Sequence, residues 1–274
     1  MAAKIHPTAI VDKTARLGDG VVIGPHVIVE PDVAIGDDCE LRAGAVLCRY
    51  TTLGAGNVVG EYSVLGGAPQ DYKFDAARRT ELRIGSGNII REYVTLSRAT
   101  TPGGATVIGD NCYLMTQSHV GHDSIIGNRV ILTNNVSIAG HAEVGDGAIL
   151  SANTLIHQFC WVGEMVMTRG NSASTQHVPP CVTLKSFNVV CGLNNVGLRR
   201  AKHITPADHE QIKEAYRLLY RCGLTPAAAL AEMDARDDWG PAAGTFRDFV
   251  RRVVAAEKPY KRGLAAHVNQ QERP

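Results

Sequence analysis

Every sixth residue in the first two-thirds of the chain is a large aliphatic one. The first series holds nine positions: Leu17, Ile23, Val29, Ile35, Leu41, Leu47, Leu53, Val59 and Leu65. The second series, which only Pro102 interrupts, is Ile84, Ile90, Leu96, Ile108, Leu114, Val120, Ile126, Leu132, Ile138, Val144, Leu150, Ile156 and Val162. A period of six fits neither an amphipathic helix nor a simple hairpin. It is typical of a β-helix, in which each short strand points one aliphatic side chain inward before the chain turns.

Three such strands make one coil of about 18 residues, and strands of successive coils pair in parallel about 4.8 Å apart. Each coil buries its interior only by stacking on its neighbours. We expect small or medium residues between the aliphatic positions to share that interior near the corners: Val58, Cys112, Val130, Val136, Ala142, Ala148, Thr154 and Cys160. The step from Leu65 to Ile84 breaks the phase and predicts an outward loop.

Composition excludes several classes of protein. With 45% apolar residues, 20% charged residues and a net charge of +1, the chain is neither disordered nor a simple polybasic nucleic-acid binder. It contains no apolar run long enough to span a membrane and no N-terminal secretion signal. Its seven cysteines include no C-x-x-C pair. We therefore expect a cytoplasmic protein with free thiols and no transmembrane segment.

The pattern changes after about residue 190. Thr205-Pro206 and Thr225-Pro226 are helix-start signals, and Thr245 is expected to start a third helix. We predict two domains: a β-helix over 1–190, with loops near 67–82 and 97–106, and a small helical domain over 191–274. From Gly192 onward the chain carries 14 Lys/Arg against 10 Asp/Glu, whereas the rest carries 14 against 17. This asymmetry is either ordinary surface variation or a sign that the basic end meets an acidic partner or a phosphate.

Four of the ten histidines fall in one part of the second series: His119, His122, His141 and His157. A coil of about 18 residues places His122, Gly140 and Gln158 in one column across adjacent coils. The neighbouring columns are Asp123, His141 and Phe159 on one side and Gly121, Ala139 and His157 on the other. Polar groups distant in sequence are thereby brought together on one strip of the surface.

Each of these histidines taken singly would read as a solvated turn residue, and a pure scaffold would leave their alignment unexplained. A cluster of histidines on a β-helix also fits a zinc site. A third interpretation is a general base, since neutral imidazole suits deprotonation of a sugar hydroxyl or amine near neutral pH. In that case the backbone N–H of Gly140 is a candidate donor to an oxyanion. No G-x-S-x-G, Walker or dinucleotide-binding motif supports serine hydrolysis, ATP use or redox chemistry.

Several short motifs resemble one family of hexapeptide-repeat enzymes of lipid A biosynthesis, the acyl-[acyl-carrier-protein]–UDP-N-acetylglucosamine O-acyltransferases. The resemblance covers nearly the whole chain. Its specific segments are Gln70-Asp71-Tyr72-Lys73, Ile90-Arg91-Glu92-Tyr93-Val94-Thr95, His119-Val120-Gly121-His122-Asp123, Ala139-Gly140-His141, His157-Gln158-Phe159-Cys160, residues 194–200 and residues 214–221.

The resemblance implies an all-β left-handed parallel β-helix followed by a small C-terminal α-helical domain, assembled as a homotrimer with active sites between prisms. It implies His122 as general base, Asp123 as the residue that orients it and Gly140 as the backbone oxyanion donor. It also implies substrate contacts by Asp71, Lys73, His119, His141, His157, Gln158, Gly170, Asn194 and Arg200. The donor is a 3-hydroxyacyl group on acyl carrier protein, the acceptor is the 3-position of UDP-N-acetylglucosamine, and neither a metal nor a separate cofactor is implied.

Two positions depart from the family pattern. Many relatives have His-Arg-Gly-Thr where this chain has Ser97-Arg98-Ala99-Thr100, which leaves the 3-amino analogue of the UDP-sugar open as acceptor. Ala201 stands where relatives often have a second Arg, although Arg199 precedes Arg200, which leaves a rearranged phosphate contact open. Gly170 matches the family position that gauges acyl length, but Arg169 beside it is bulky, so no acyl length is assigned. An N-acyltransferase acting on acylated UDP-glucosamine would carry an additional N-terminal uridine-binding domain, and the repeat here begins by about residue 17. A γ-type carbonic anhydrase, which needs zinc, is the remaining alternative of a different class.

Overall fold

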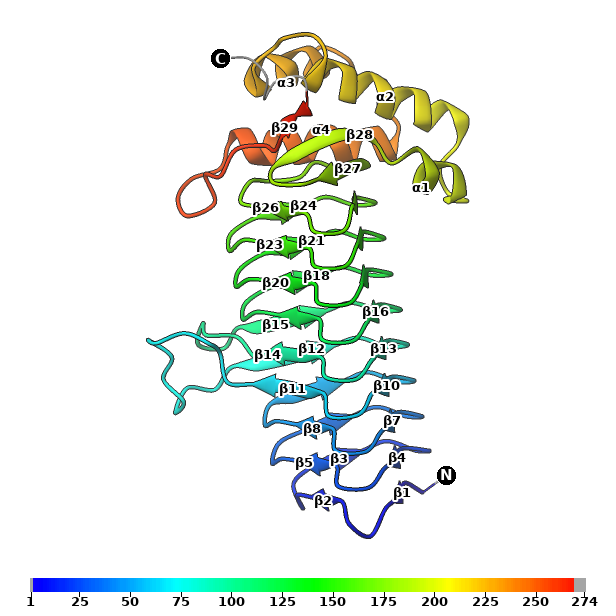
Figure 1. Cartoon of the computed structure of the whole chain (residues 1–274), viewed down its shortest axis with the longest axis vertical. Coiled ribbons are helices and arrows are strands. Elements are labelled where there is room, and N and C mark those ends of the chain that lie inside the picture. Colours follow the sequence, from blue (N-terminus) through cyan, green and yellow to red (C-terminus); the bar gives the residue numbers. More distant parts are fainter. Residues whose placement is uncertain (1, 269–274) are drawn as a thin grey trace.

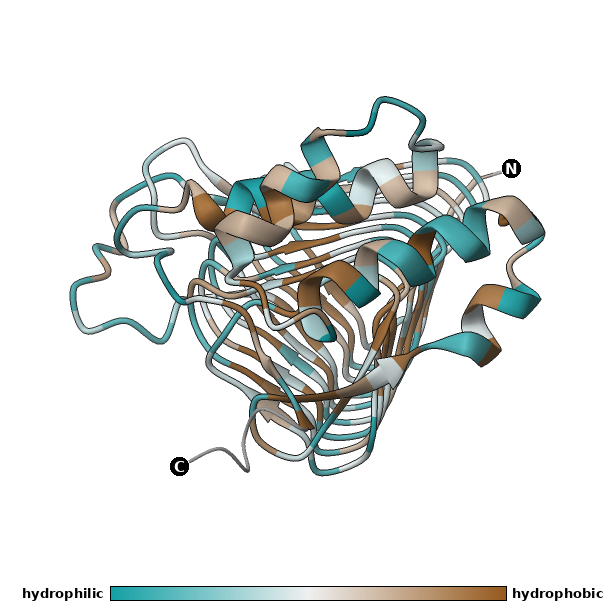
Figure 2. Cartoon of the chain, turned by 90° about the horizontal axis from the view of Figure 1, so that it is seen from above, coloured by the Kyte–Doolittle hydropathy of each residue, from teal (hydrophilic) through white to brown (hydrophobic). Residues whose placement is uncertain are grey.

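The protein is a tall three-sided prism closed at one end by helices, as the computed structural model shows (Figure 1). The structure describes residues 2–268. The ends of the two predicted domains, residue 1 and residues 269–274, lie outside the described residues. Seen along its length, the prism has a triangular outline with the helices lying across its top (Figure 2).

Short strands stack into three sheets, here called faces A, B and C, one for each side of the prism. Face A contains β1 (Lys4–Ile5), β4 (Val22–Ile23), β7 (Glu40–Leu41), β10 (Val58–Val59), β13 (Ile89–Ile90), β16 (Tyr113–Leu114), β19 (Ile131–Leu132), β22 (Ile149–Leu150), β25 (Met167–Thr168), β27 (Val182–Lys185), β28 (Val189–Leu193) and β29 (Ala266–His267). Face B contains β2 (Ile10–Val11), β5 (Ile28–Val29), β8 (Val46–Leu47), β11 (Val64–Gly67), β14 (Thr95–Ser97), β17 (His119–Val120), β20 (Ser137–Ile138), β23 (Leu155–Ile156) and β26 (Ala173–Ser174). Face C contains β3 (Arg16–Leu17), β6 (Ala34–Ile35), β9 (Thr51–Leu53), β12 (Glu81–Ile84), β15 (Ala105–Ile108), β18 (Ile125–Ile126), β21 (Glu143–Val144) and β24 (Trp161–Val162).

Neighbouring strands on the three faces pair in parallel, except β27 with β28 at the end of face A, and the parallel stacking confirms the left-handed β-helix expected for this chain. In a regular coil the partners are 18 residues apart, as in His119 paired with Ser137. Val64 pairs with Thr95, 31 residues away, and Glu81 pairs with Ala105, 24 residues away. These steps accommodate two extra loops, 68–80 and 98–104, which both leave face B and enter face C. Both loops therefore emerge at the same corner of the prism.

The interior of the prism is built from the aliphatic series. From Ile23 to Val162 every member of both series is at most 4% exposed. Aliphatic burial of this kind contributes roughly 25 cal/mol per Å² of surface removed from water, which favours tight stacking of the coils. The expectation for Val58 is wrong, because the buried position beside it is Asn57, at 0% exposure. Asn57 Nδ2 donates to the carbonyl oxygens of Gly54 (2.7 Å) and Gly85 (2.9 Å), and its Oδ1 accepts from Asn88, so its polarity is satisfied.

The C-terminal part closes the last coil. Strand β28 turns back antiparallel to β27, and β29 pairs with β28 from the far end of the chain. The helices are α1 (Asn195–Arg200), α2 (Pro206–Tyr220), α3 (Pro226–Asp234) and α4 (Pro241–Val254). Thr205 and Thr225 cap α2 and α3 as expected. The predicted start of α4 at Thr245 is wrong: the helix begins at Pro241, because proline at the first helical position provides an earlier start signal.

Arg252 and His177 make contacts that join the C-terminal part of the chain to the prism. Arg252 of α4 donates to both carboxylate oxygens of Glu143 at 2.7 and 2.6 Å and lies over the Trp161 ring at 3.6 Å. The buried ring of His177 accepts a hydrogen bond from the backbone N–H of Trp161 (3.0 Å) and contacts the carbonyl oxygen of Tyr260 at 2.7 Å. The C-terminal segment is thereby held beside the upper coils. No helix in the described part of the chain combines the length and the apolar character needed to cross a bilayer.

Candidate active site

The candidate site lies on the corner between faces B and C. Strands β17, β20 and β23 pair in register there, and each is followed by a tight turn. Three turn residues in one column have left-handed backbone conformations: Asp123 (φ 58°), His141 (φ 58°) and Phe159 (φ 62°). The N–H of His141 donates to the carbonyl of His122 at 2.9 Å, which joins successive turns. The structure thus aligns the turns in the columns predicted from the repeat.

His122 and Asp123 form a hydrogen-bonded pair. Nδ1 of His122 lies 2.8 Å from Oδ2 of Asp123, and the two side chains are 18% and 9% exposed. Burial by itself would raise the pKa of Asp123, but hydrogen bonds from His122 and from Thr100 and Thr101 hold it well below its usual range. The carboxylate is therefore ionised at neutral pH. A carboxylate only accepts hydrogen bonds, so the proton of this pair resides on Nδ1, and the lone pair of the neutral ring is on Nε2.

Two further histidines flank this pair. His141 is packed edge-to-face against His122, with ring centroids 5.1 Å apart, and its Nε2 lies 3.8 Å from Asp123 Oδ2. Its other side stacks on Phe159 at 4.8 Å. His119 Nδ1 contacts Thr95 Oγ1 at 2.8 Å. Burial lowers the pKa of both His119 and His141, so both rings are neutral near pH 7.

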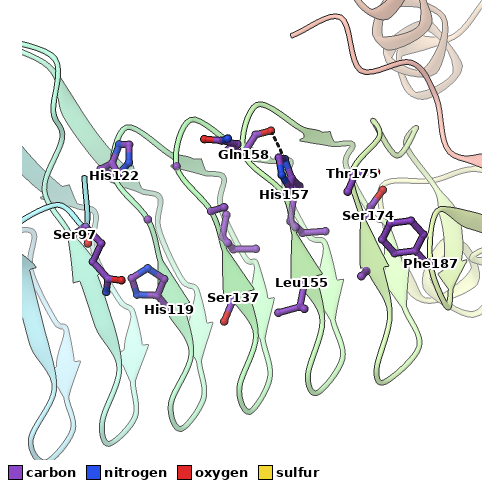
Figure 3. Close-up of a pocket in the computed structure, with 17 residues that line it drawn as sticks. Ser97, His119, His122, Ser137, Leu155, His157, Gln158, Ser174, Thr175 and Phe187 are labelled. Carbon is purple, nitrogen blue, oxygen red and sulfur yellow. Dashed lines mark hydrogen bonds between the residues drawn. The ribbon is translucent and has the colours of Figure 1, made fainter. Parts of the chain in front are cut away.

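A cavity of about 540 Å³ opens along face B beside this corner (Figure 3). His119 and His122 lie at one end, and Ser174, Thr175 and Phe187 lie at the other. The remaining lining residues are Gln70, Ser97, Gly121, Ser137, Ile138, Ala139, Gly140, Leu155, Ile156, His157, Gln158 and Ala173. Polar side chains thus occur at both ends of the cavity, and the apolar side chains of Leu155 and Phe187 lie away from His122.

The structure brings several of the predicted site residues together. His119, His122, Gly140, His157 and Gln158 line the cavity. In the close-up, His157 is joined to the backbone of Gln158, its Nδ1 lying 3.1 Å from the Gln158 carbonyl oxygen (Figure 3). Asp123 and His141 contact His122 directly and are not among the residues that line the cavity.

The long loop 68–80 supplies a second group of predicted residues. Gln70 lines the cavity, and Asp71 is close enough to His141 to influence its pKa electrostatically. The side chain of Asp71 accepts a hydrogen bond from the N–H of Lys73 at 2.9 Å, which shapes the turn. Asp71 is partly buried and Lys73 is exposed.

Three predicted residues lie elsewhere in the chain. Asn194 caps α1 by accepting from the N–H of Gly197 at 3.0 Å, and its Nδ2 donates to the Met165 carbonyl at 2.9 Å. Together with Arg200 it lines a separate cavity of about 400 Å³. Gly170 lies at the turn between β25 and β26, on the corner between faces A and B, and is not among the residues that line the His122 cavity.

Two lining residues, Leu155 and Phe187, were not among the site residues predicted from the sequence. Phe187 belongs to the irregular turn between β27 and β28, and Leu155 points outward from face B. An outward aliphatic position alternates with the inward one along a strand, so Leu155 was detectable by that alternation. Phe187 follows no periodic pattern that would have revealed it.

His122, Asp123 and His141 also form a group suited to a metal ion. One donor atom from each of the three lies within 4.8 Å of the others. Imidazole and carboxylate ligands suit zinc. Oδ2 of Asp123 already accepts hydrogen bonds from His122 and Thr100, and Oδ1 accepts one from Thr101, so a metal would compete with these donors for the carboxylate.

The comparisons with known proteins agree with this architecture. Residues 178–264 match the profile described as UDP N-acetylglucosamine O-acyltransferase, domain 2, and residues 14–49 and 105–140 match the bacterial transferase hexapeptide profile. An acyl-[acyl-carrier-protein]–UDP-N-acetylglucosamine O-acyltransferase from Xanthomonas campestris is 39% identical over 95% of this chain and 98% of its own length. One from Halorhodospira halophila is 42% identical over 81% of this chain and 86% of its own.

Solved structures support the same assignment. UDP-N-acetylglucosamine O-acyltransferase from Moraxella catarrhalis superposes with a TM-score of 0.88 at 35% identity, covering 95% of this chain and 99% of that one. The protein from Campylobacter jejuni gives 0.86 at 31% identity, covering 96% of this chain and 99% of its own. This chain is an acyltransferase that belongs to the acyl-[acyl-carrier-protein]–UDP-N-acetylglucosamine O-acyltransferase family.

Proposed function

We propose that this protein transfers a 3-hydroxyacyl group from acyl carrier protein to the 3-position of UDP-N-acetylglucosamine, the first step of lipid A biosynthesis, in the cytoplasm. The observation that carries the proposal is the His122–Asp123 pair at one end of a cavity that also contains the apolar side chains of Leu155 and Phe187. The sugar would lie near His122, and the acyl chain would follow the apolar groups toward Phe187.

In this proposal Nε2 of His122 removes the proton from the sugar hydroxyl as its oxygen attacks the thioester carbonyl carbon. The backbone N–H of Gly140 donates to the resulting oxyanion. The tetrahedral intermediate collapses with cleavage of the C–S bond, and the imidazolium returns its proton to the departing thiolate. The products are the ester and the free thiol of the phosphopantetheine arm, so no metal and no separate cofactor is needed.

The active unit in this proposal is a homotrimer. Asn194 and Arg200, expected at the nucleotide, lie in a different cavity from His122 within one chain. A neighbouring copy would bring its Asn194 and Arg200 toward the sugar nucleotide. Exposed aliphatic side chains on the prism faces, among them Ile89 (46%), Ile125 (48%) and Leu155 (53%), suit burial between prisms. The remaining substrate residues, Asp71, Lys73, His119, His141, His157 and Gln158, would contact the sugar and the donor.

One observation favours a second acceptor. Ser97, which stands at the position where many relatives carry histidine, lines the cavity and is 5% exposed. The smaller side chain leaves a different hydrogen-bonding environment near the acceptor atom. The amide-forming alternative, with the 3-amino analogue of the UDP-sugar as acceptor, is therefore tested alongside the hydroxyl.

The test is a turnover assay in which several 3-hydroxyacyl carrier-protein donors are paired with both UDP-sugars. We expect saturable transfer to at least one of them and a loss of at least about 10²-fold in rate for His122→Ala, as for removal of a general base. His6→Ala, at an exposed position in the first coil, is the matched control and should retain full rate. Near-normal turnover by His122→Ala would refute the base assignment. Zinc bound stoichiometrically by the purified protein, together with carbon dioxide hydration, would favour the carbonic-anhydrase alternative.

A further inference from the structure

Thr100 lies in the short loop 98–104, outside the repeat, and contacts Asp123 of the candidate site. Its backbone N–H and its hydroxyl both donate to Oδ2 of Asp123, at 2.9 and 2.6 Å. The N–H of Thr101 donates to the other carboxylate oxygen, Oδ1, at 3.2 Å. With the His122 bond, Oδ2 accepts three hydrogen bonds and the Asp123 carboxylate accepts four in total.

The loop that carries Thr100 is itself held in place. Ala99 is fully buried, and its N–H donates to the Glu81 carbonyl at 3.1 Å. The N–H of Arg98 donates to the Gly67 carbonyl at 3.0 Å. The Arg98 side chain is only 6% exposed and contacts the rings of Tyr50 and Phe74, with its guanidinium carbon 5.8 and 5.3 Å from their centroids. Thr100 is therefore presented to Asp123 from an anchored backbone.

The backbone of Asp123 is fixed from a further direction. Its N–H donates to Oγ1 of Thr106, a fully buried residue of β15, at 2.8 Å. Asp123 adopts a left-handed turn conformation, and three of the four hydrogen bonds that its carboxylate accepts come from Thr100 and Thr101. The orientation of the carboxylate therefore depends on the donors in loop 98–104.

We propose that Thr100 is a positioning residue of the transfer reaction, whose hydroxyl holds the Asp123 carboxylate in the orientation that keeps His122 aimed at the substrate. This inference rests on the proposed role of His122 as general base. The carboxylate bonds that Thr100 makes are charge-assisted, the class that fixes geometry most strongly. A small misplacement of a catalytic group is costly to the rate.

The experiment compares Thr100→Val, which removes the hydroxyl from a side chain of similar shape, with Thr100→Ser, which retains it. We expect Thr100→Val to lower kcat by about ten-fold to a hundred-fold, with little change in KM for the UDP-sugar. Thr100→Ser should recover most of that loss. Thr52→Val is the matched control: Thr52 of β9 is exposed and is not among the residues that line the cavity, so its kcat should stay near that of the wild type.

A double-mutant cycle separates positioning from general damage to the fold. If Thr100 acts through Asp123, Thr100→Val should produce no further loss in an Asp123→Ala background. A kcat for Thr100→Val within two-fold of wild type, or an equal loss in both backgrounds, would overturn the inference. If His122→Ala remains active, the result contradicts the proposed role of His122 as general base rather than the role of Thr100. If Thr100→Val lowers the thermal midpoint, the cycle still applies. General damage to the fold would lower kcat in both backgrounds, whereas loss of positioning would lower kcat only where Asp123 is present.

Discussion

Gly140 lies against the imidazole of His122. A Cβ built on Gly140 would be 2.6 Å from Cε1 and 2.7 Å from Nε2 of that ring. Real Cβ atoms do not approach other atoms so closely, so any other residue at position 140 would displace the ring. The ring is held in turn by Asp123, whose Oδ2 is 2.8 Å from Nδ1.

We predict that Gly140→Ala impairs catalysis without unfolding the prism. The added methyl group must push the His122 ring away from its position, which breaks or stretches the bond to Asp123. We expect kcat to fall by at least about ten-fold, since small misplacements of a catalytic group are costly. Circular dichroism should show an intact fold. Gly244→Ala in α4, where a Cβ would meet no atom within 4 Å, is the control and should keep its activity. A fully active Gly140→Ala enzyme would show that the His122 ring can shift without loss of its catalytic function.

The Asp123 carboxylate makes a pH-dependent contribution to stability. Its pKa in the folded protein lies below its usual range, so the folded state binds a proton less readily than the unfolded chain does. The contribution is therefore complete above the unfolded pKa of about 3.9 and is lost as the pH falls through the lower folded value. Asp123→Asn, which cannot ionise, lacks this contribution.

We predict that the difference in unfolding free energy between wild type and Asp123→Asn is largest at neutral pH. It should narrow as the pH is lowered below about 4, where the unfolded carboxyl becomes protonated. Urea denaturation monitored between pH 7 and pH 3 would measure both curves. A difference that stays constant over this range would mean that the carboxylate gains no net stabilisation from Thr100, Thr101 and His122.

The periodic part of the site could be predicted because the repeat determines which residues are neighbours. Once the coil length is known, His122, Gly140 and Gln158 must form a column, and so must Asp123, His141 and Phe159. The structure contains both columns because His119, Ser137 and Leu155 pair in register. The six-residue period likewise predicts that the side chains of the aliphatic series point inward and are buried.

The aperiodic part could not be predicted in this way. Thr100 reaches Asp123 across 23 residues, a separation set by an inserted loop rather than by the coil. Phe187 belongs to an irregular turn, and Asn194 and Arg200 lie beside a different cavity of the same chain. Asn57 replaces an expected apolar neighbour because the carbonyls of Gly54 and Gly85 need donors where the chain leaves its regular spacing.

Asn57 therefore provides a test of how much its buried hydrogen bonds contribute to stability. It is fully buried, and its side chain bonds to Gly54, Gly85 and Asn88. We predict that Asn57→Val lowers the free energy of unfolding by roughly 2–4 kcal/mol, because it leaves several buried groups without partners at about 1–3 kcal/mol each before relaxation. Val33→Ala, which removes two methyl groups from a fully apolar interior site, is the comparison for simple loss of packing. An Asn57→Val protein as stable as the wild type would show that water replaces the amide.

His177 secures the C-terminal segment, and its contribution should also depend on pH. The ring is fully buried. Its Nδ1 accepts a hydrogen bond from the backbone N–H of Trp161, and its Nε2 contacts the carbonyl oxygen of Tyr260. These partners require the neutral ring with its proton on Nε2, and burial lowers the pKa of His177. The unfolded chain consequently binds the proton more readily than the folded one.

We predict that His177→Ala lowers the free energy of unfolding by roughly 2–4 kcal/mol at pH 8, through the cavity and the two unpaired backbone groups that it leaves. Because the folded pKa lies below the unfolded value of about 6.5, this loss should shrink as the pH falls through 6.5. Denaturation curves at pH 8, 6.5 and 5 provide the measurement, with His6→Ala at an exposed position of the first coil as the control. A penalty that grows toward low pH would mean that the imidazolium is the form bound in the folded protein, and that the assigned proton position on His177 is incorrect.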